Sequence, residues 1–307
     1  MFKRLMSLKT NSITSAAIII AAASLLSRIL GVVRDHVLAA RFGAGNELDI
    51  YYAAFRIPDF VYNIVILGAL SAGFIPIFVG LFKSDSSDKY HDNHEAWDLV
   101  NNAINIVGIF SVVICLILAV LSPWIIPLIT PGFGGDKMLA TVALTRIMFL
   151  SPILLGLSGI IGGVLQSTKR FLMFSLAPVM YNVGIILGAI FLVKPFGLMG
   201  LAYGVILGAL MHLLIQLPTA FSIGFRYHPI FNLKDNNFLR IVRMTGPRLL
   251  SLASSQINLT IITILASTLA AGSLAVFNLS NNLQSFPVGI IGVAYAVAVF
   301  PILSKHF

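Results

Sequence analysis

Five arginines lie within or at the edges of strongly apolar stretches of the chain, where charged side chains are costly. They are Arg28, Arg34, Arg56, Arg146 and Arg248. A charge at the centre of a membrane-spanning helix costs about 2.5–3.5 kcal/mol even on insertion scales, so such residues usually face a bundle interior or a wet cavity. Arginine stays charged there and can bind phosphate oxygens in a bidentate way. The pattern therefore predicts a cationic, partly hydrated cavity that receives an anionic substrate.

Acidic residues accompany three of these arginines. Asp35 follows Arg28 by seven positions, which places the two on one face of a continuous helix, and Asp49 and Asp59 flank Arg56. Structural ion pairs, Arg28 with Asp35 and Arg56 with Asp49 or Asp59, are the alternative to substrate binding. Arg146 and Arg248 lie near the ends of their stretches and can reach the membrane surface. The candidate substrate-binding residues are Arg28, Arg34, Arg56, Asp35, Asp49 and Asp59.

The composition excludes an ordinary water-soluble domain. The 307 residues are 58% hydrophobic and 10% charged, whereas soluble domains have about 25% charged residues. A membrane-spanning helix needs about 20 apolar residues, and several such runs are present. We therefore predict an all-α, polytopic membrane bundle with about eight transmembrane helices. The predicted spans are 12–40, 50–82, 98–121, 140–166, 174–193, 197–221, 246–270 and 275–303.

The charge of the loops indicates how the chain crosses the membrane. The formal net charge of +9 is spread over short loops without a basic stripe, so a nucleic-acid partner is not expected. With the amino terminus in the cytoplasm, most loop Lys and Arg residues lie on the cytoplasmic side, and only Arg41, Lys137 and Lys194 lie outside. This bias is typical of the positive-inside rule and predicts a cytoplasmic amino terminus.

Two repeated patterns predict how the helices are organised. Small residues recur at four-residue spacing, which lets helix backbones approach closely in lipid. Segment 74–78 (FIPIF) resembles 299–303 (VFPIL), and 43–45 (GAG) resembles 270–272 (AAG). Transporters are often built from such repeats. We predict a first lobe of six helices at 1–225, a cytoplasmic linker at 226–245, and at 246–307 the first hairpin of an incomplete second lobe. The small residues are Gly159 and Gly163, Gly184 and Gly188, and Gly200, Gly204 and Gly208.

Motifs for ATP hydrolysis, zinc proteolysis and serine hydrolysis are absent from the sequence, so we expect neither an enzyme nor a cofactor. A membrane enzyme acting on polyprenyl phosphates would need paired acidic residues for Mg²⁺. Asp49 and Asp59 are ten residues apart, which is about 15 Å along a helix and too far to share a metal. Work against a gradient would then depend on the membrane potential or an ion gradient.

Many short segments of the chain, in order, resemble the MurJ/MviN family. The first helices carry 27–35 (SRILGVVRD), 42–45 (FGAG), Asp49, 54–58 (AFRIP) and 68–76 (GALSAGFIP). Later segments are 130–133 (TPGF), 170–171 (RF), 177–178 (AP), Asn182, 216–218 (QLP), 246–247 (GP), 255–257 (SQI), 286–287 (FP) and 301–305 (PILSK). The resemblance covers nearly the whole chain.

The resemblance implies a bacterial cell-membrane transporter of peptidoglycan biosynthesis, in the superfamily of multidrug, oligosaccharidyl-lipid and polysaccharide exporters. Such proteins move lipid II, an undecaprenyl-pyrophosphate-linked precursor, from the cytoplasmic to the outer leaflet by alternating access through a cationic cavity. The implied cavity residues are Arg28 and Arg34 of the first helix, and Arg56 of the second with Asp49 before it. The alternatives are export of another polyprenyl-linked glycan and a non-transporting fragment. The oligomeric state is not predicted.

Four positions depart from the charged residues that the resemblance implies. Tyr62 stands where some members have arginine, and Leu67 where a glutamate is common. Asn282 and Ser285 stand where an arginine and a glutamate precede the Phe-Pro pair. Arg248 is the candidate replacement for the missing arginine, and Asn282 is a further candidate for substrate contact.

Overall fold

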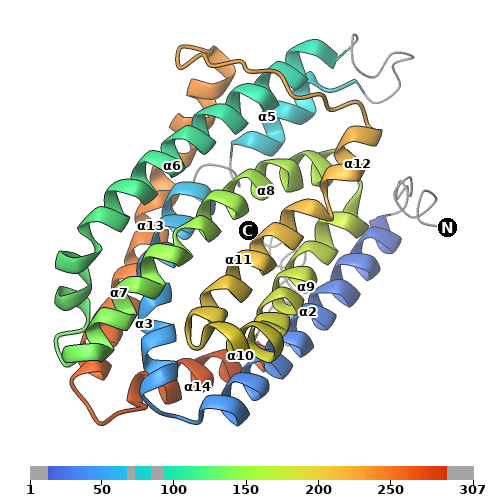
Figure 1. The fold of residues 1–307 in the computed structure, drawn as a ribbon. Coiled ribbons are helices and arrows are strands. Elements are labelled where there is room, and N and C mark those ends of the chain that lie inside the picture. The colour runs from blue at the N-terminus through green and yellow to red at the C-terminus, as the bar shows by residue number, and fades with distance from the viewer. Residues whose placement is uncertain (1–12, 68–72, 84–92, 289–307) are drawn as a thin grey trace, which may run out of the picture.

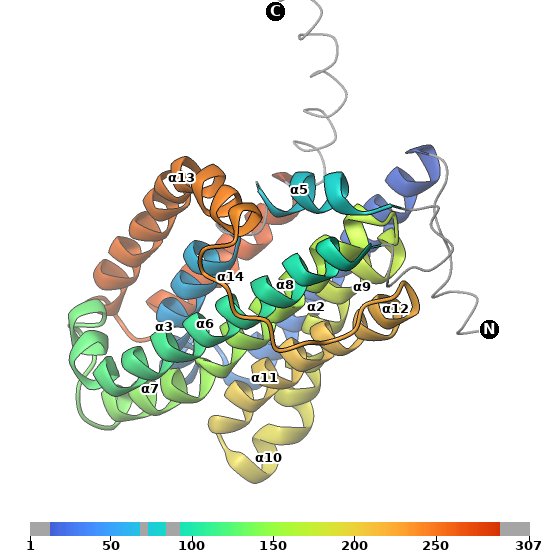
Figure 2. The ribbon, with the colours of Figure 1, turned by 90° about the horizontal axis from the view of Figure 1, so that it is seen from above.

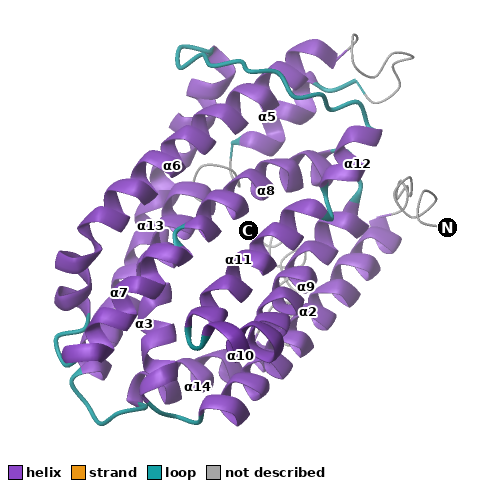
Figure 3. Cartoon of the chain, in the orientation of Figure 1, coloured by secondary structure: helices purple, strands orange, loops and turns teal. Residues whose placement is uncertain are grey.

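The computed structural model describes residues 13–67, 73–83 and 93–288. Within these ranges the chain forms helices joined by turns and loops, and no strand is present (Figure 3). This confirms the all-α class. Six described helical stretches are long and apolar enough to cross a membrane, and each corresponds to a predicted span. The two other predicted spans, 50–82 and 275–303, include residues outside the described ranges.

The helices form an elongated bundle in which α13 runs beside α6 and α14 crosses one end (Figures 1 and 2). In chain order they are α2 (Ile13–Phe42), α3 (Asn46–Val61), the π-helix η1 (Tyr62–Leu67), α5 (Phe74–Leu81), α6 (His94–Ile129), α7 (Gly135–Met148), α8 (Leu150–Ser167), α9 (Phe171–Leu187), the π-helix η3 (Gly188–Leu192), α10 (Val193–Phe196), α11 (Met199–Leu214), α12 (Leu217–Ser222), α13 (Asn236–Ser267) and α14 (Ser273–Pro287).

The two ends of the bundle differ in structure. One end, the Asp49 end, carries Asp49 and the loops 43–45, 130–134 and 268–272. The other, the strap end, carries residues 225–235, an extended segment that we call the strap. A buried cluster lies toward each end: one includes Leu48, Tyr51 and Leu274, and the other includes Phe78 and Trp97. The hairpin of α13 and α14 contributes to both clusters, which fixes it to the first bundle.

Glycines bring α9 and α11 into backbone contact, as the small-residue spacing predicts. A Cβ added to Gly184 would overlap with the backbone of Gly208, and one added to Gly188 would overlap with Gly204. Such close approach maximises van der Waals contact between helices in lipid, where the hydrophobic effect is weak. At the strap end, a Cβ on Gly163 would meet the ring of Phe74 at 2.9 Å.

Three asparagines on one face of α6 hold the strap. Asn101 accepts a hydrogen bond from the backbone N–H of His228 (3.0 Å) and donates to the carbonyl of Arg226 (3.0 Å). Asn102 accepts from the N–H of Asn232 (2.7 Å) and donates to its carbonyl (2.9 Å). Asn105 donates to the carbonyls of His228 (3.2 Å) and Ile230 (2.8 Å). The strap is therefore attached to α6 along its length.

Removing one of these amides should release the strap. Asn102 is buried, so Asn102→Leu leaves both backbone groups of Asn232 without their partner, at a cost of about 1–3 kcal/mol for each group. We expect hydrogen exchange in residues 226–235 to rise at least tenfold. Mass spectrometry of exchanged peptides measures this, with Asn236→Leu at the exposed first residue of α13 as a control. Unchanged exchange would show that other contacts hold the strap.

The predicted seventh span, 246–270, agrees with the apolar stretch Leu249–Ser267, but the helix that contains this stretch begins ten residues before residue 246. Helix α13 begins at Asn236 and continues through Gly246 and Pro247. The side chain of Asp235 accepts a hydrogen bond from the N–H of Phe238 (2.7 Å), which is the usual cap at a helix start. The acidic cap was present in the sequence, but the polar residues that follow it are not typical of a membrane span. The division into lobes stays a prediction.

Candidate functional site

A polar cavity of about 170 Å³ lies between α2 and α14. Arg28, Arg34 and Asp35 from α2 line it opposite Asn282 and Ser285 from α14. Helix α2 continues through Gly31 as one helix, so the three charged residues lie within two turns of each other. The structure therefore brings together three of the predicted candidates and one further candidate, Asn282.

Asp35 is the centre of a hydrogen-bond network that joins the first bundle to α14. Arg34 contacts Asp35 Oδ1 through Nε (2.9 Å) and Nη2 (2.8 Å), and its Nη1 donates to Asn182 Oδ1 on α9 (3.1 Å). Asn282 Nδ2 donates to Asp35 Oδ2 (3.0 Å). Charge-assisted hydrogen bonds of this kind are about twice as strong as neutral ones. The Arg34 guanidinium is thus held in a fixed orientation at the cavity wall.

The alternative pairing of Arg28 with Asp35 is not found between these two described residues. Arg28 Nη1 instead donates to the backbone carbonyl of Ser285 (3.0 Å), and this contact is exposed. Asp35 is instead paired with the neighbouring residue Arg34. Arg28 therefore lines the cavity without a carboxylate partner among the described residues.

A second cavity of about 260 Å³ adjoins the first and shares Arg34 and Asn282 with it. It lies between α3, α9, α13 and α14. Its charged residues are Arg34, Arg56 and Asp59. The two cavities together contain three arginines and two aspartates, an excess of one positive charge. The other lining residues are Tyr51, Tyr52, Phe55, Tyr181, Leu259, Asn278 and Asn281.

Arg56 is the least satisfied of the cavity arginines. Arg56 is only 8% exposed, yet its Nε and Nη1 have no hydrogen-bond partner among the described residues. Asp59 lines the same cavity but is not bonded to either atom. A buried donor without a partner costs about 1–3 kcal/mol, and more when it is charged. An anion in the cavity would remove this cost.

Asp49 lies outside both cavities, at the Asp49 end of the bundle. Asp49 is 2% exposed, and its Oδ2 accepts hydrogen bonds from Lys137 Nζ (2.9 Å) and from the N–H of Gly272 (2.8 Å). Its Oδ1 accepts from the N–H of Ala275 (3.0 Å). Asp49 is therefore not the partner of Arg56, since it caps α14 and binds Lys137. Both carboxylate oxygens of Asp49 therefore accept hydrogen bonds within the protein.

Three further positions singled out in the sequence, Arg248, Tyr62 and Leu67, lie on α13 and η1. Arg248 lies within α13, but its side chain is outside the described part of the structure. Tyr62 begins η1 directly after α3, four residues beyond Pro58, as expected where proline weakens a helix. Leu67 ends η1, and its side chain also lies outside the described residues.

Apart from Asn282, sequence reasoning did not select the amides and phenols of the site. Asn182 was part of a motif, yet its contact with Arg34 depends on packing between α9 and α2. Asn278, Asn281, Asn282 and Ser285 follow helical spacing on α14 and form one polar stripe. The i, i+3, i+4 and i+7 spacing of these polar residues was present in the sequence and indicates a polar helix face that can form a cavity wall.

Comparison with known proteins decides the family. The family model described as lipid II flippase MurJ matches residues 38–307. The chain belongs to the MurJ lipid II flippase family. A probable lipid II flippase MurJ from Buchnera aphidicola is 33% identical over 92% of this chain and 55% of that protein. One from Vibrio cholerae is 31% identical over 94% of this chain and 56% of that protein.

Solved structures show the same fold at lower identity. A lipid II flippase MurJ in an inward closed conformation matches with a TM-score of 0.75 and 23% identity, over 94% of this chain and 59% of that one. An outward-facing multidrug resistance transporter of the MATE family, in the MOP superfamily, matches with a TM-score of 0.62 and 15% identity, over 93% and 62%. The chain thus spans about half the length of the curated MurJ relatives it matches.

Proposed function

We propose that this protein takes part in moving lipid II from the cytoplasmic to the outer leaflet of a bacterial cell membrane. The head group would enter the two adjoining cavities, where the arginines would bind its pyrophosphate. The cavities would then open to the two sides of the membrane in turn, by alternating access. The relatives' names support the substrate, because they are called lipid II flippases. No enzymatic step and no cofactor are part of this proposal.

The observation that carries the proposal is that the buried Nε and Nη1 of Arg56 have no hydrogen-bond partner among the described residues. A pyrophosphate brings negative charge into a space of low dielectric constant, where a fixed cation attracts it much more strongly than in water. Arginine presents a planar pair of donors that match phosphate oxygens. Arg28 supplies a second cation at the other end of the cavity pair, while Arg34 is held by Asp35. Small cationic drugs would favour acidic cavities, which the excess of arginine opposes.

We propose that the strap end faces the cytoplasm. Most basic loop residues lie near that end, including Arg170 and Lys234, whereas Arg41, Lys137 and Lys194 lie near the Asp49 end. The membrane potential could then drive export. One negative charge that moves outward across an inside-negative potential of about 100 mV releases about 2.3 kcal/mol. An ion gradient is the alternative source of work.

Binding of lipid II to variants of the full-length protein tests the function. Each arginine–phosphate contact is worth about 1.5–3 kcal/mol, so Arg56→Gln and Arg28→Gln should each weaken binding by at least tenfold. Native mass spectrometry with purified lipid II measures the bound fraction. Lys194→Gln is the matched control, because Lys194 is exposed and remote from both cavities.

The outcomes separate two transport hypotheses. Loss of lipid II binding in the cavity variants but not in the control supports the pyrophosphate site. A wild-type protein that ignores lipid II but binds another polyprenyl-pyrophosphate glycan would assign that glycan as the substrate, and the change at Asn282 and Ser285 would be the first place to look for the cause. A wild-type protein that binds neither would refute the proposal.

A further inference from the structure

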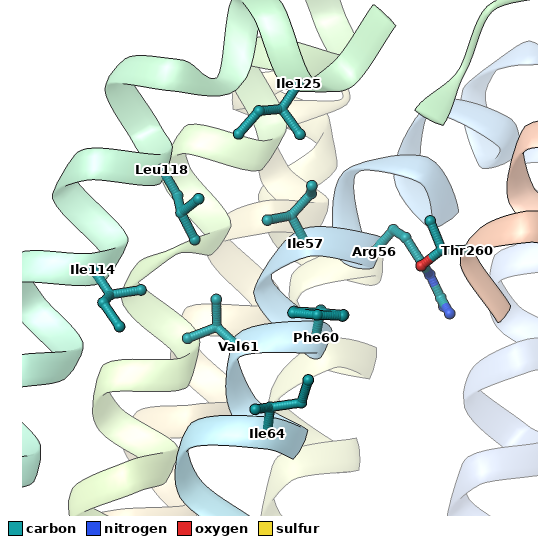
Figure 4. Close-up of a pocket in the computed structure, with 9 residues that line it drawn as sticks. All are labelled: Arg56, Ile57, Phe60, Val61, Ile64, Ile114, Leu118, Ile125 and Thr260. Atoms are coloured by element: carbon teal, nitrogen blue, oxygen red, sulfur yellow. The ribbon is translucent and has the colours of Figure 1, made fainter. Parts of the chain in front are cut away.

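An apolar groove of about 310 Å³ begins at the same arginine that lines the polar cavity. Its walls come from four elements: Ile57, Phe60 and Val61 of α3, Ile64 of η1, Ile114, Leu118 and Ile125 of α6, and Thr260 of α13. Figure 4 shows the α6 residues on one side of α3 and Thr260 beside Arg56 on the other. The groove therefore crosses the face of α3 from α6 toward α13.

Arg56 is common to the groove and to the second polar cavity. The polar cavity is lined by phenols, amides and charges, whereas the groove is lined by aliphatic and aromatic side chains apart from Arg56 and Thr260. Thr260 donates its hydroxyl to the carbonyl of Gln256 (2.8 Å), which leaves Arg56 as the unsatisfied donor of the groove. The arrangement joins a cation that has two unpaired N–H groups, on Nε and Nη1, to an apolar channel.

A ligand that satisfies both surfaces has a phosphate attached directly to a hydrocarbon chain. Because Arg56 is buried, a phosphate bound there draws the first carbons of its chain away from the bilayer and into the protein. Those carbons would meet polar walls in the second cavity, at a loss of about 25 cal/mol for each Å² that is not buried against apolar atoms. The groove provides apolar walls at the position where the chain must leave the phosphate.

The groove has the size of a chain segment rather than of a whole lipid. Its 310 Å³ would hold roughly ten carbon atoms, if each occupies about the 30 Å³ of a water molecule in the liquid. Leu121 lies on the same face of α6 as Ile114 and Ile125 and is 40% exposed, so the rest of a long chain can continue from the groove into the membrane beside it.

We propose that this groove binds the phosphate-proximal isoprene units of the transported lipid while Arg56 binds its phosphate. This rests on the proposed function and adds a tail site to it. The lipid then crosses with its first isoprene units on α3 and α6, and only the distal chain remains in the bilayer. Ordinary phospholipid in the groove is the competing occupant.

Filling the groove tests the tail site. Leu118→Trp should weaken binding of lipid II by at least tenfold in the full-length protein, but should leave binding of a tail-less pyrophosphate-linked analogue of its head group unchanged. Leu116→Trp is the matched control, since Leu116 lies two residues away on α6 and is 61% exposed on its outer face. Equal loss of both probes would assign the effect to the head-group site and would overturn the tail site.

The outcomes also separate the tail site from the proposed function. If the wild-type protein binds both probes and Leu118→Trp binds lipid II as tightly, the groove inference fails while the proposed function stands. If the wild-type protein binds neither probe, the proposed function fails and the groove inference falls with it.

Photo-crosslinking locates the isoprene chain of the bound lipid and tests the tail site independently. Lipid II with a diazirine on its second isoprene unit should label peptides that contain Ile114 and Leu118, or Ile57 and Phe60, in vesicles of phosphatidylethanolamine and phosphatidylglycerol. Label found only on Leu116, Val120 or α2 would place the chain in the bilayer and overturn the proposal. Groove labelling by diazirine-bearing phosphatidylglycerol that lipid II does not displace would overturn it in favour of ordinary phospholipid.

Discussion

Gly204→Ala is expected to lower the amount of folded protein sharply. A Cβ at this position would lie 2.7 Å from the Cα of Gly188, 3.3 Å from the carbonyl oxygen of Ile185 and 3.4 Å from that of Gly184. All three atoms are backbone, so no side-chain rotation relieves the overlap, and α9 and α11 must separate. Overpacking commonly costs about 1–3 kcal/mol and more where the backbone must move, so we expect a loss of about 3 kcal/mol.

The measurement is the midpoint of thermal unfolding in detergent, together with the monodisperse fraction in gel filtration. Gly80→Ala is the control, because a Cβ there meets no atom within 4 Å in helix α5. That substitution should be neutral or stabilise by up to about 1 kcal/mol, since alanine restricts the unfolded chain more than glycine does. If Gly204→Ala and Gly80→Ala unfolded at the same temperature, the close contact of α9 with α11 would not contribute to stability.

The packing at Gly204 could be predicted from spacing alone, because small residues four apart form one helix stripe whatever their partner. The helix that packs against Gly204 could not be predicted, because spacing along the sequence does not show that Gly188 lies beside Gly204 in space. The same holds for fold class, since apolar runs of sufficient length require membrane helices, while the contacts between those helices depend on side-chain fit.

The charged residues show where sequence reasoning ended. The apolar surroundings of Arg28, Arg34 and Arg56 predicted that they would face an interior, and the structure places all three at adjoining cavities. Pairing by helical periodicity gave Arg28 the partner that Arg34 takes, because periodicity ignores the rotamer and the neighbouring helix. Asp49 was grouped with the cavity because it precedes Arg56, although its partners come from α7 and α14, far along the chain.

Asp49→Ala is expected to loosen the contact between α14 and the first bundle at the Asp49 end. Gly272, the residue at the start of α14, has no side chain to cap the helix, and Asp49 supplies the missing acceptor from α3. The carboxylate also meets the positive end of the α14 dipole and neutralises Lys137. Removing one partner of a buried ion pair costs about 3–5 kcal/mol.

Hydrogen exchange at the amides of Gly272 and Ala275 measures this loss. A decrease of about 3 kcal/mol in opening free energy raises their exchange more than a hundredfold, whereas Glu47→Ala, which removes an exposed carboxylate from the same turn of α3, should change it little. Lys137→Met should have a smaller effect than Asp49→Ala, because Asp49 then keeps its two backbone donors. Equal exchange in Asp49→Ala and wild type would mean that the apolar contacts of Leu274 and Ala275 hold α14 without the carboxylate. A selective rise would identify Asp49 as the residue that holds the start of α14 against α3.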